Sequence, residues 1–163
     1  MAFAPRGSGK SFLALSIGVA VANGSTLMRW QAPRPRRVLL IDGEMPLPDL
    51  QARLSAILLG ADCKVLDDYL RILAADNSEQ GINLSTAEGQ RALDPHLDGV
   101  DLLILDNLST LTSGAEGASE AWLPMQNWLL ALRRKGIAVL LIHHSGVNGR
   151  QRGTSRREDA LDT

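Results

Sequence analysis

The 163-residue chain is 45% hydrophobic, 21% charged and 4% aromatic, a composition that is typical of one globular domain and excludes a disordered or fibrous protein. Seventeen Lys and Arg residues against 18 Asp and Glu residues give a net charge of -1, which excludes a general basic surface for a polyanion and leaves only local contacts with nucleic acid. The single Cys63 excludes an intramolecular disulfide, and the apolar stretches are too short for a signal peptide or a membrane span, so we expect a cytoplasmic protein.

The first predicted helix covers residues 11–22, SFLALSIGVAVA, which are apolar nearly all round and suit a helix buried against a sheet. Asn23-Gly24 supplies a signal for the end of this helix. The proline- and arginine-rich residues 30–37 predict an exposed connector. It leads into VLLID at residues 38–42, a continuously apolar strand that is typical of a parallel sheet covered on both faces.

The rest of the chain alternates predicted helices and strands. Apolar periodicity predicts helices over residues 46–59, 86–97 and 119–135, and strands over residues 69–74, 100–106 and 137–143. Strands that alternate with helices indicate an α/β fold with a mostly parallel, doubly wound sheet and helices on both faces.

The ends of the chain carry little predicted structure. Only Met1, Ala2 and Phe3 precede the first glycine-rich motif, whereas such a motif normally follows a strand of about five or six residues. Residues 159–163 read as the start of another element. We therefore expect residues 1–163 to form one domain core that lacks most of its first strand and the strands after Thr163.

That glycine-rich motif, APRGSGKS at residues 4–11, matches the pattern of a phosphate-binding loop at its second glycine, its lysine and its serine, with Ala4 in place of the first glycine. Such a loop turns backbone N–H groups toward a phosphate, which requires glycines at positive φ and the N-terminus of a helix. The alternative is a glycine-rich turn before an ordinary helix. We expect nucleotide contacts from Pro5, Arg6, Gly7, Ser8, Gly9, Lys10, Ser11 and Phe12, with Lys10 on the phosphates and the Ser11 hydroxyl on Mg²⁺.

Two further acids follow predicted strands. Asp106 ends LLILD, where it can hold Mg²⁺ at the sheet edge that faces the loop; alternatively, Asp106-Asn107 caps the next turn. Glu44 follows VLLID and can polarise an attacking water as general base. Asp42, one residue inside the strand, is its nearest competitor for this role.

Two histidines, His143 and His144, end the last predicted strand. An imidazole N–H there can sense the γ-phosphate, although polar residues that close a strand, or a metal site, are alternatives. Successive strand residues face opposite ways, so at most one of the two reaches the nucleotide. A zinc site is disfavoured because Cys63 and His96 lie far away in sequence and show no ligand spacing.

Four arginines follow the histidines within a polar, glycine-containing segment without periodicity: Arg150, Arg152, Arg156 and Arg157. This segment can contact a nucleic-acid backbone or the nucleotide of a neighbouring subunit, or it is simply a solvated run of charge.

Taken in order, APRGSGKS, VLLIDGEMP, DLLILDNLSTL, and LLIHHSG followed by QRGTSRREDALD resemble the RecA-like P-loop ATPases of the plasmid replicative-helicase group, the RepA-type or AAA-family ATPases of phages and mobile elements. The resemblance covers nearly the whole chain. It implies that Lys10 and Ser11 bind phosphate and Mg²⁺, that Glu44 is the catalytic base, that Asp106 is the second acidic motif, and that His144 or His143 senses the γ-phosphate.

The resemblance further implies an ATPase that acts on single-stranded DNA during replication of a plasmid, phage or mobile element. Similar proteins form homo-oligomeric rings, often hexamers, in which a neighbour supplies an arginine finger. The loop between Ser145 and Arg157 would then grip DNA, although Val147 stands where relatives commonly have a basic residue. Two alternatives remain: an ATP-dependent switch or assembly module with little turnover, and a small-molecule kinase, in which the two histidines and the arginines have no obvious place.

Overall fold

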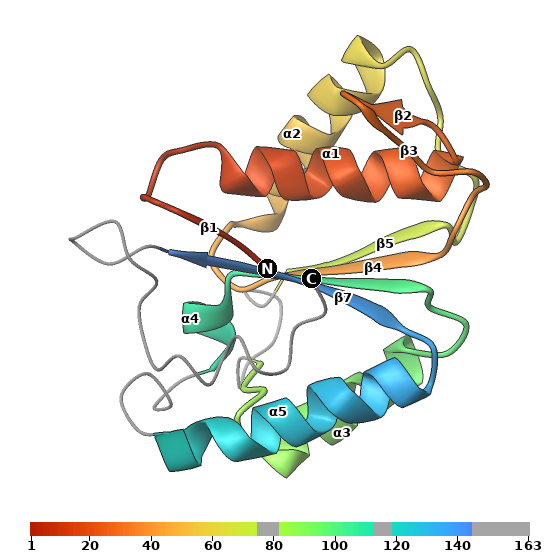
Figure 1. The fold of residues 1–163 in the computed structure, drawn as a ribbon. Coiled ribbons are helices and arrows are strands. Elements are labelled where there is room, and N and C mark those ends of the chain that lie inside the picture. The colour runs from red at the N-terminus through yellow and green to blue at the C-terminus, as the bar shows by residue number, and fades with distance from the viewer. Residues whose placement is uncertain (75–81, 113–118, 145–163) are drawn as a thin grey trace.

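The computed structural model describes residues 1–74, 82–112 and 119–144. Five parallel strands form the central sheet in the order β1-β7-β6-β4-β5. Their bounds are Ala2–Ala4 for β1, Val38–Asp42 for β4, Leu70–Ala74 for β5, Leu102–Asp106 for β6 and Ala138–His144 for β7. The α/β fold with a mostly parallel sheet, as expected for a RecA-like P-loop core, is confirmed (Figure 1).

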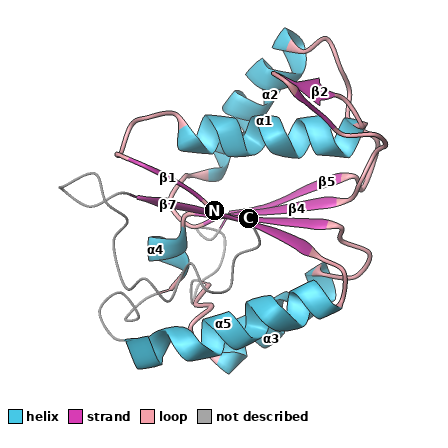
Figure 2. Cartoon of the chain, viewed as in Figure 1, coloured by secondary structure: helices cyan, strands magenta, loops and turns pink. Residues whose placement is uncertain are grey.

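Helices cover both faces of this sheet, as Figure 2 shows. Helices α1 (Lys10–Asn23) and α2 (Leu47–Gly60) lie on one face, and α3 (Ala87–Leu93), α4 (Leu108–Leu111) and α5 (Ser119–Arg134) lie on the other. Among the described residues, none of the helices combines the length and the apolar character that crossing a membrane requires.

The alternation of side chains along β4 explains why its first four residues are all apolar. Val38 and Leu40 belong to the core under α1 and α2, whereas Leu39 and Ile41 belong to the core on the α5 side. All five residues of β4 are buried. A strand covered on both faces needs apolar side chains on both, which is the pattern that predicted a parallel sheet.

Helix α1 has glycine at both ends. Gly9 is its N-cap with φ of 83°, and Gly24 is its C-cap with φ of 61°. The Gly24 and Ser25 N–H groups donate to the carbonyl oxygens of Val21 and Ala20, which satisfies acceptors at the end of the helix. The predicted end at Asn23-Gly24 is therefore confirmed.

The structure corrects three local predictions. Residues 30–37 are not wholly a connector, because β3 (Trp30–Gln31) pairs antiparallel with β2 (Thr26–Leu27). The helix predicted over residues 86–97 is shorter: α3 ends at Leu93 and a 3-10 turn, Asp94–His96, follows, because Pro95 lacks the N–H that an α-helix needs there. Helix α4 was not predicted, since four residues show no periodicity.

Candidate functional site

Three polar side chains share one face of the sheet at its carboxyl edge. Asp42 pairs with Asp106 across β4 and β6, and His144 ends β7, between β6 and β1. The residue two positions before Asp42, Asp106 or His144 lies in the core on the α1 face. Because side chains two apart on a strand share a face, all three point toward α1 and the loop that precedes it.

The glycine-rich loop joins β1 to α1. Gly7 and Gly9 have φ of 75° and 83°, a region that residues with a Cβ rarely adopt. The Lys10 ammonium donates hydrogen bonds to the carbonyl oxygens of Ala4 at 2.8 Å and Pro5 at 2.6 Å. The loop thus curls around its own lysine, at the N-terminus of a 14-residue helix, and this arrangement suits an anion.

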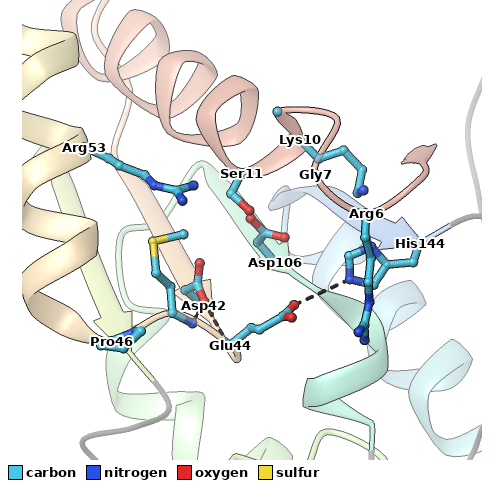
Figure 3. A pocket seen from close by; sticks show the side chains of 12 residues that line it. Arg6, Gly7, Lys10, Ser11, Asp42, Glu44, Pro46, Arg53, Asp106 and His144 are labelled. Atoms are coloured by element: carbon cyan, nitrogen blue, oxygen red, sulfur yellow. Dashed lines mark hydrogen bonds and ion pairs between the residues drawn. The ribbon is translucent and has the colours of Figure 1, made fainter.

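A cavity of about 420 Å³ lies between this loop and the edge of the sheet. Three cationic side chains and three carboxylates line it, and Figure 3 shows them converging from the loop, α2 and the strand ends. These six residues are Arg6, Lys10, Arg53, Asp42, Glu44 and Asp106. Ser11 and His144 complete the polar lining.

Asp106 is buried, with 4% of its surface exposed. Burial raises the pKa of Asp106 to about 6; the neighbouring carboxylates of Asp42 and Glu44 also raise it, and a hydrogen bond from the Ser11 hydroxyl and the charge of Lys10 oppose the rise. The Ser11 hydroxyl and the Asp106 carboxylate therefore meet in the cavity, and both offer the oxygen ligands that Mg²⁺ prefers.

Asp42 has a structural task that Glu44 lacks. One carboxylate oxygen of Asp42 accepts hydrogen bonds from the backbone N–H groups of Glu44 at 2.8 Å and Met45 at 2.7 Å. Burial raises the pKa of Asp42, while these two hydrogen bonds lower it. Asp42 thus holds the turn after β4, and this turn carries Glu44 to the mouth of the cavity, where its side chain is 50% exposed.

Glu44 is linked to His144 through Asn107. The Asn107 Nδ2 lies 2.5 Å from Glu44 Oε2 and 3.0 Å from His144 Nε2, and 3.5 Å separates His144 Nε2 from Glu44 Oε2. Asn107 is 1% exposed and is also the N-cap of α4, because its Oδ1 accepts from Thr110 N–H. The capping alternative raised for the Asp106-Asn107 pair thus describes Asn107, while Asp106 faces the cavity.

The structure places four of the sequence candidates outside the cavity lining. Pro5 and Ser8 contact Lys10 instead, through the Pro5 carbonyl oxygen and the Ser8 Oγ. Phe12 is 49% exposed and borders a different, more apolar cavity between α1, α2 and the β2–β3 hairpin. His143 is fully buried on the opposite face, with Nδ1 3.3 Å from Ser109 Oγ. Its placement follows from alternation along β7.

Two residues of the site had no sequence prediction. Arg53 lines the cavity from α2, one turn after the buried Leu50, so the helical stripe that faces the sheet continues into a charged side chain. Asn107 follows a strand directly, as N-cap residues often do, but nothing in the sequence shows that its amide reaches Glu44 and His144.

The other sites considered from the sequence are a metal site, Cys63 and a DNA-binding loop. Within residues 1–74, 82–112 and 119–144, no group of three or more His, Cys, Asp or Glu residues could hold a metal ion. Cys63 is partly buried and its sulfur accepts a hydrogen bond from Asn23 at 3.1 Å. The proposed DNA-binding loop at residues 145–157 lies outside the described residues.

The chain matches a known family. The model of the family described as AAA domain matches residues 1–150, which includes every residue of the cavity. No curated protein matches the chain.

Proposed function

The chain belongs to the AAA domain family of nucleotide-binding ATPases, and on this premise we propose that it binds ATP with Mg²⁺ in the cavity beside the glycine-rich loop and hydrolyses it. The observation that carries this proposal is the convergence of Lys10, Ser11, Asp106 and Glu44 on one cavity (Figure 3). These side chains come from three separate segments and supply an anion site, oxygen ligands and a base.

The loop and Lys10 bind the phosphates in this proposal. Backbone N–H groups at the start of α1 and the Lys10 ammonium attract the β- and γ-phosphates. Phosphate oxygens then replace the carbonyl oxygens of Ala4 and Pro5, which the ammonium contacts in this structure. Arg6 and Arg53 add positive charge at the two sides of the cavity.

The Ser11 hydroxyl and the Asp106 carboxylate would hold Mg²⁺. Mg²⁺ commonly keeps several waters and uses one or two carboxylates together with substrate phosphates, so a set of two side chains fits. Burial raises the pKa of Asp106, and a Mg²⁺ ion beside the carboxylate would offset this cost of its negative charge. When bound, Mg²⁺ neutralises charge on the phosphates.

Glu44 is the general base in this mechanism, and it orients and deprotonates the water that attacks the γ-phosphate. Its carboxylate lies at the open side of the cavity, whereas Asp42 is engaged by two backbone N–H groups. His144 is the histidine that contacts the γ-phosphate, because it lines the cavity and His143 does not.

We propose further that residues 1–163 form a single RecA-like ATPase core, and that ATP hydrolysis drives movement on, or remodelling of, single-stranded DNA in replication of a plasmid, phage or mobile element. Residues 145–157 would contact the DNA, and the full-length protein would form a homo-oligomeric ring such as a hexamer. The ordered motifs and the local arginines of this segment support the proposal.

The test is Mg²⁺-dependent ATP hydrolysis by the full-length protein, with and without single-stranded DNA. Glu44→Gln removes the base and is expected to lower kcat by roughly 10²–10⁴-fold, while Glu88→Gln, on the far face in α3, is the matched control. Hydrolysis that Glu44→Gln leaves intact would disprove the role of Glu44. ATP hydrolysis or oligomerisation that DNA changes would support the motor.

A second candidate is a nucleotide-dependent switch or assembly module with little turnover. The hydrogen bond from Asn107 to Glu44 favours it, because a carboxylate oxygen that already accepts from the amide is less available to an attacking water. Tight ATP binding with negligible hydrolysis, indifferent to DNA, would establish this candidate in place of the motor.

A further inference from the structure

Both the amide oxygen and the amide nitrogen of the Asn107 side chain have hydrogen-bond partners. Its oxygen accepts from the Thr110 backbone N–H at 3.2 Å, and because that N–H can only donate, the amide orientation is fixed. The amide nitrogen therefore faces Glu44 and His144. Of its two hydrogens, one goes to the Glu44 carboxylate and the other to His144 Nε2.

This arrangement assigns the imidazole proton. At 3.0 Å from the amide nitrogen, His144 Nε2 presents its lone pair to an amide hydrogen, and the ring proton then lies on Nδ1; the Nε2–Glu44 Oε2 separation, 3.5 Å, is the longer of the two contacts. His144 Nδ1 is buried and has no hydrogen-bond partner among the described residues. The ring is thus held in place through Nε2 and Asn107, rather than through Nδ1.

The assignment conflicts with a direct contact between His144 Nε2 and a phosphate. A phosphate oxygen accepts hydrogen bonds, so Nε2 would have to carry a proton to donate to it. That change removes the lone pair that Asn107 uses. Binding of the phosphate at Nε2 and retention of the Asn107 hydrogen bond therefore exclude each other.

We propose that Asn107 is a positioning residue that couples His144 to Glu44: one amide holds both side chains, and a phosphate that binds His144 Nε2 displaces the amide and thereby changes how the Glu44 carboxylate is held. The coupling rests on the proposed ATP hydrolysis. The proton assignment, in contrast, concerns the nucleotide-free protein alone, so the two can be tested separately.

The variant Asn107→Asp isolates the amide hydrogens. Aspartate keeps an oxygen for Thr110 N–H and is an equally good N-cap, but it has no hydrogens to donate to Glu44 or His144. Asn107→Ser is the second variant, because serine also caps helices and carries no negative charge. Ser109→Ala is the matched control, since Ser109 contacts His143 on the opposite face.

The first readout is the ¹⁵N spectrum of the histidine rings in the nucleotide-free protein. The chain has three histidines, so substitution of His96 and of His143 assigns the His144 signals. The wild type is expected to show the proton on Nδ1, and Asn107→Asp to move a proton to Nε2, facing the new carboxylate. A proton on Nε2 in the wild type, or signals that neither Asn107 variant changes, would overturn the proposal.

The second readout is the split between kcat and KM for ATP. Both Asn107 variants are expected to lower kcat roughly tenfold to a hundredfold, as for a misplaced catalytic group. They should leave KM for ATP unchanged or lower it, because no amide then competes with the phosphate for His144 Nε2. In a Glu44→Gln background, the Asn107 substitutions should lower single-turnover rates no further. An equal loss in both backgrounds would disprove coupling through Glu44. Absence of hydrolysis in the wild type would refute the proposed function, and the ring spectrum would still decide the proton assignment.

Discussion

The Asp106 carboxyl group is buried, and burial is the main cause that raises its pKa to about 6 from 3.8. Because the folded-state pKa lies above the unfolded value, ionisation of Asp106 lowers stability as the pH rises from about 4 to about 6, and the loss stays constant at higher pH. Asp106→Asn removes that cost and keeps an oxygen for the Ser11 hydroxyl. At pH 8 in EDTA and without nucleotide, the variant should be more stable to urea, by up to about 3 kcal/mol.

The advantage of Asp106→Asn should shrink toward zero below about pH 4, where the wild-type carboxyl is protonated in both states. Asp67→Asn, at an exposed position, controls for the loss of one negative charge. Equal stability of Asp106→Asn and wild type at pH 8 would show that burial does not strain this carboxyl. If Asp106 holds Mg²⁺ as proposed, its burial is a loss of stability of the kind that functional residues often carry.

The sequence alone can identify a functional residue when that residue lies directly beside a recognisable strand or glycine-rich loop. Asp106, Glu44 and Lys10 stand beside recognisable strands or glycines, and the structure brings all three to the cavity. Arg53 and Asn107 could not be found in this way. Their contacts depend on how α2 and β7 sit against β4 and β6, and a single sequence does not encode such distances in any local pattern.

Helix α1 ends where the following segment crosses it closely. A Cβ on Gly24 would lie 2.5 Å from the Pro35 nitrogen and 2.6 Å from the Arg34 carbonyl carbon, and its φ is 61°. Gly24→Ala is therefore expected to destabilise the protein by at least about 1–2 kcal/mol, from the left-handed backbone alone. Thermal and urea unfolding measure this.

Gly60→Ala provides the comparison. Gly60 is the last residue of α2, and a Cβ there meets no heavy atom within 4 Å. This substitution should be neutral or stabilising by up to about 1 kcal/mol, as in other helices. If both alanine variants had the same stability, the close crossing at Pro35 would carry no energetic weight.

Element length decides what periodicity can predict. Strands of five mostly buried residues and helices of 14 residues or more give clear patterns, as in β4, β6, α1 and α5. The two-residue strands β2 and β3 and the four-residue α4 span only about one period of a strand or helix pattern, so no repeat can be seen in them. Their positions follow from packing against longer elements.

The whole molecule should gain stability from Mg²⁺ and ATP. A ligand that binds only the folded state adds about 2.7 kcal/mol at a concentration of 100 Kd, which corresponds to roughly 5–10 °C in Tm for a domain of this size. A non-hydrolysable ATP analogue with Mg²⁺ should therefore raise Tm in differential scanning fluorimetry. EDTA should reduce the shift, since the Ser11 and Asp106 oxygens would lose their cation.

Lys10→Ala should abolish most of this shift, and Lys64→Ala, at an exposed position outside the cavity, should retain it. Equal shifts in both variants would mean that the nucleotide binds elsewhere.

The α/β class could be inferred from alternating elements, but the strand order β1-β7-β6-β4-β5 could not, because strand neighbours are far apart in the chain.

That order has a geometric consequence. β7 lies between β1, which leads into the glycine-rich loop, and β6, which ends at Asp106. Neighbouring strands are about 4.8 Å apart, so the two ends of the site are separated by roughly 10 Å across the sheet. Only the insertion or loss of a strand between β1 and β6 would change this separation. The sheet therefore fixes the distance between the end of β1 and the end of β6. Substitutions around the cavity can change what binds at either place, but not this distance.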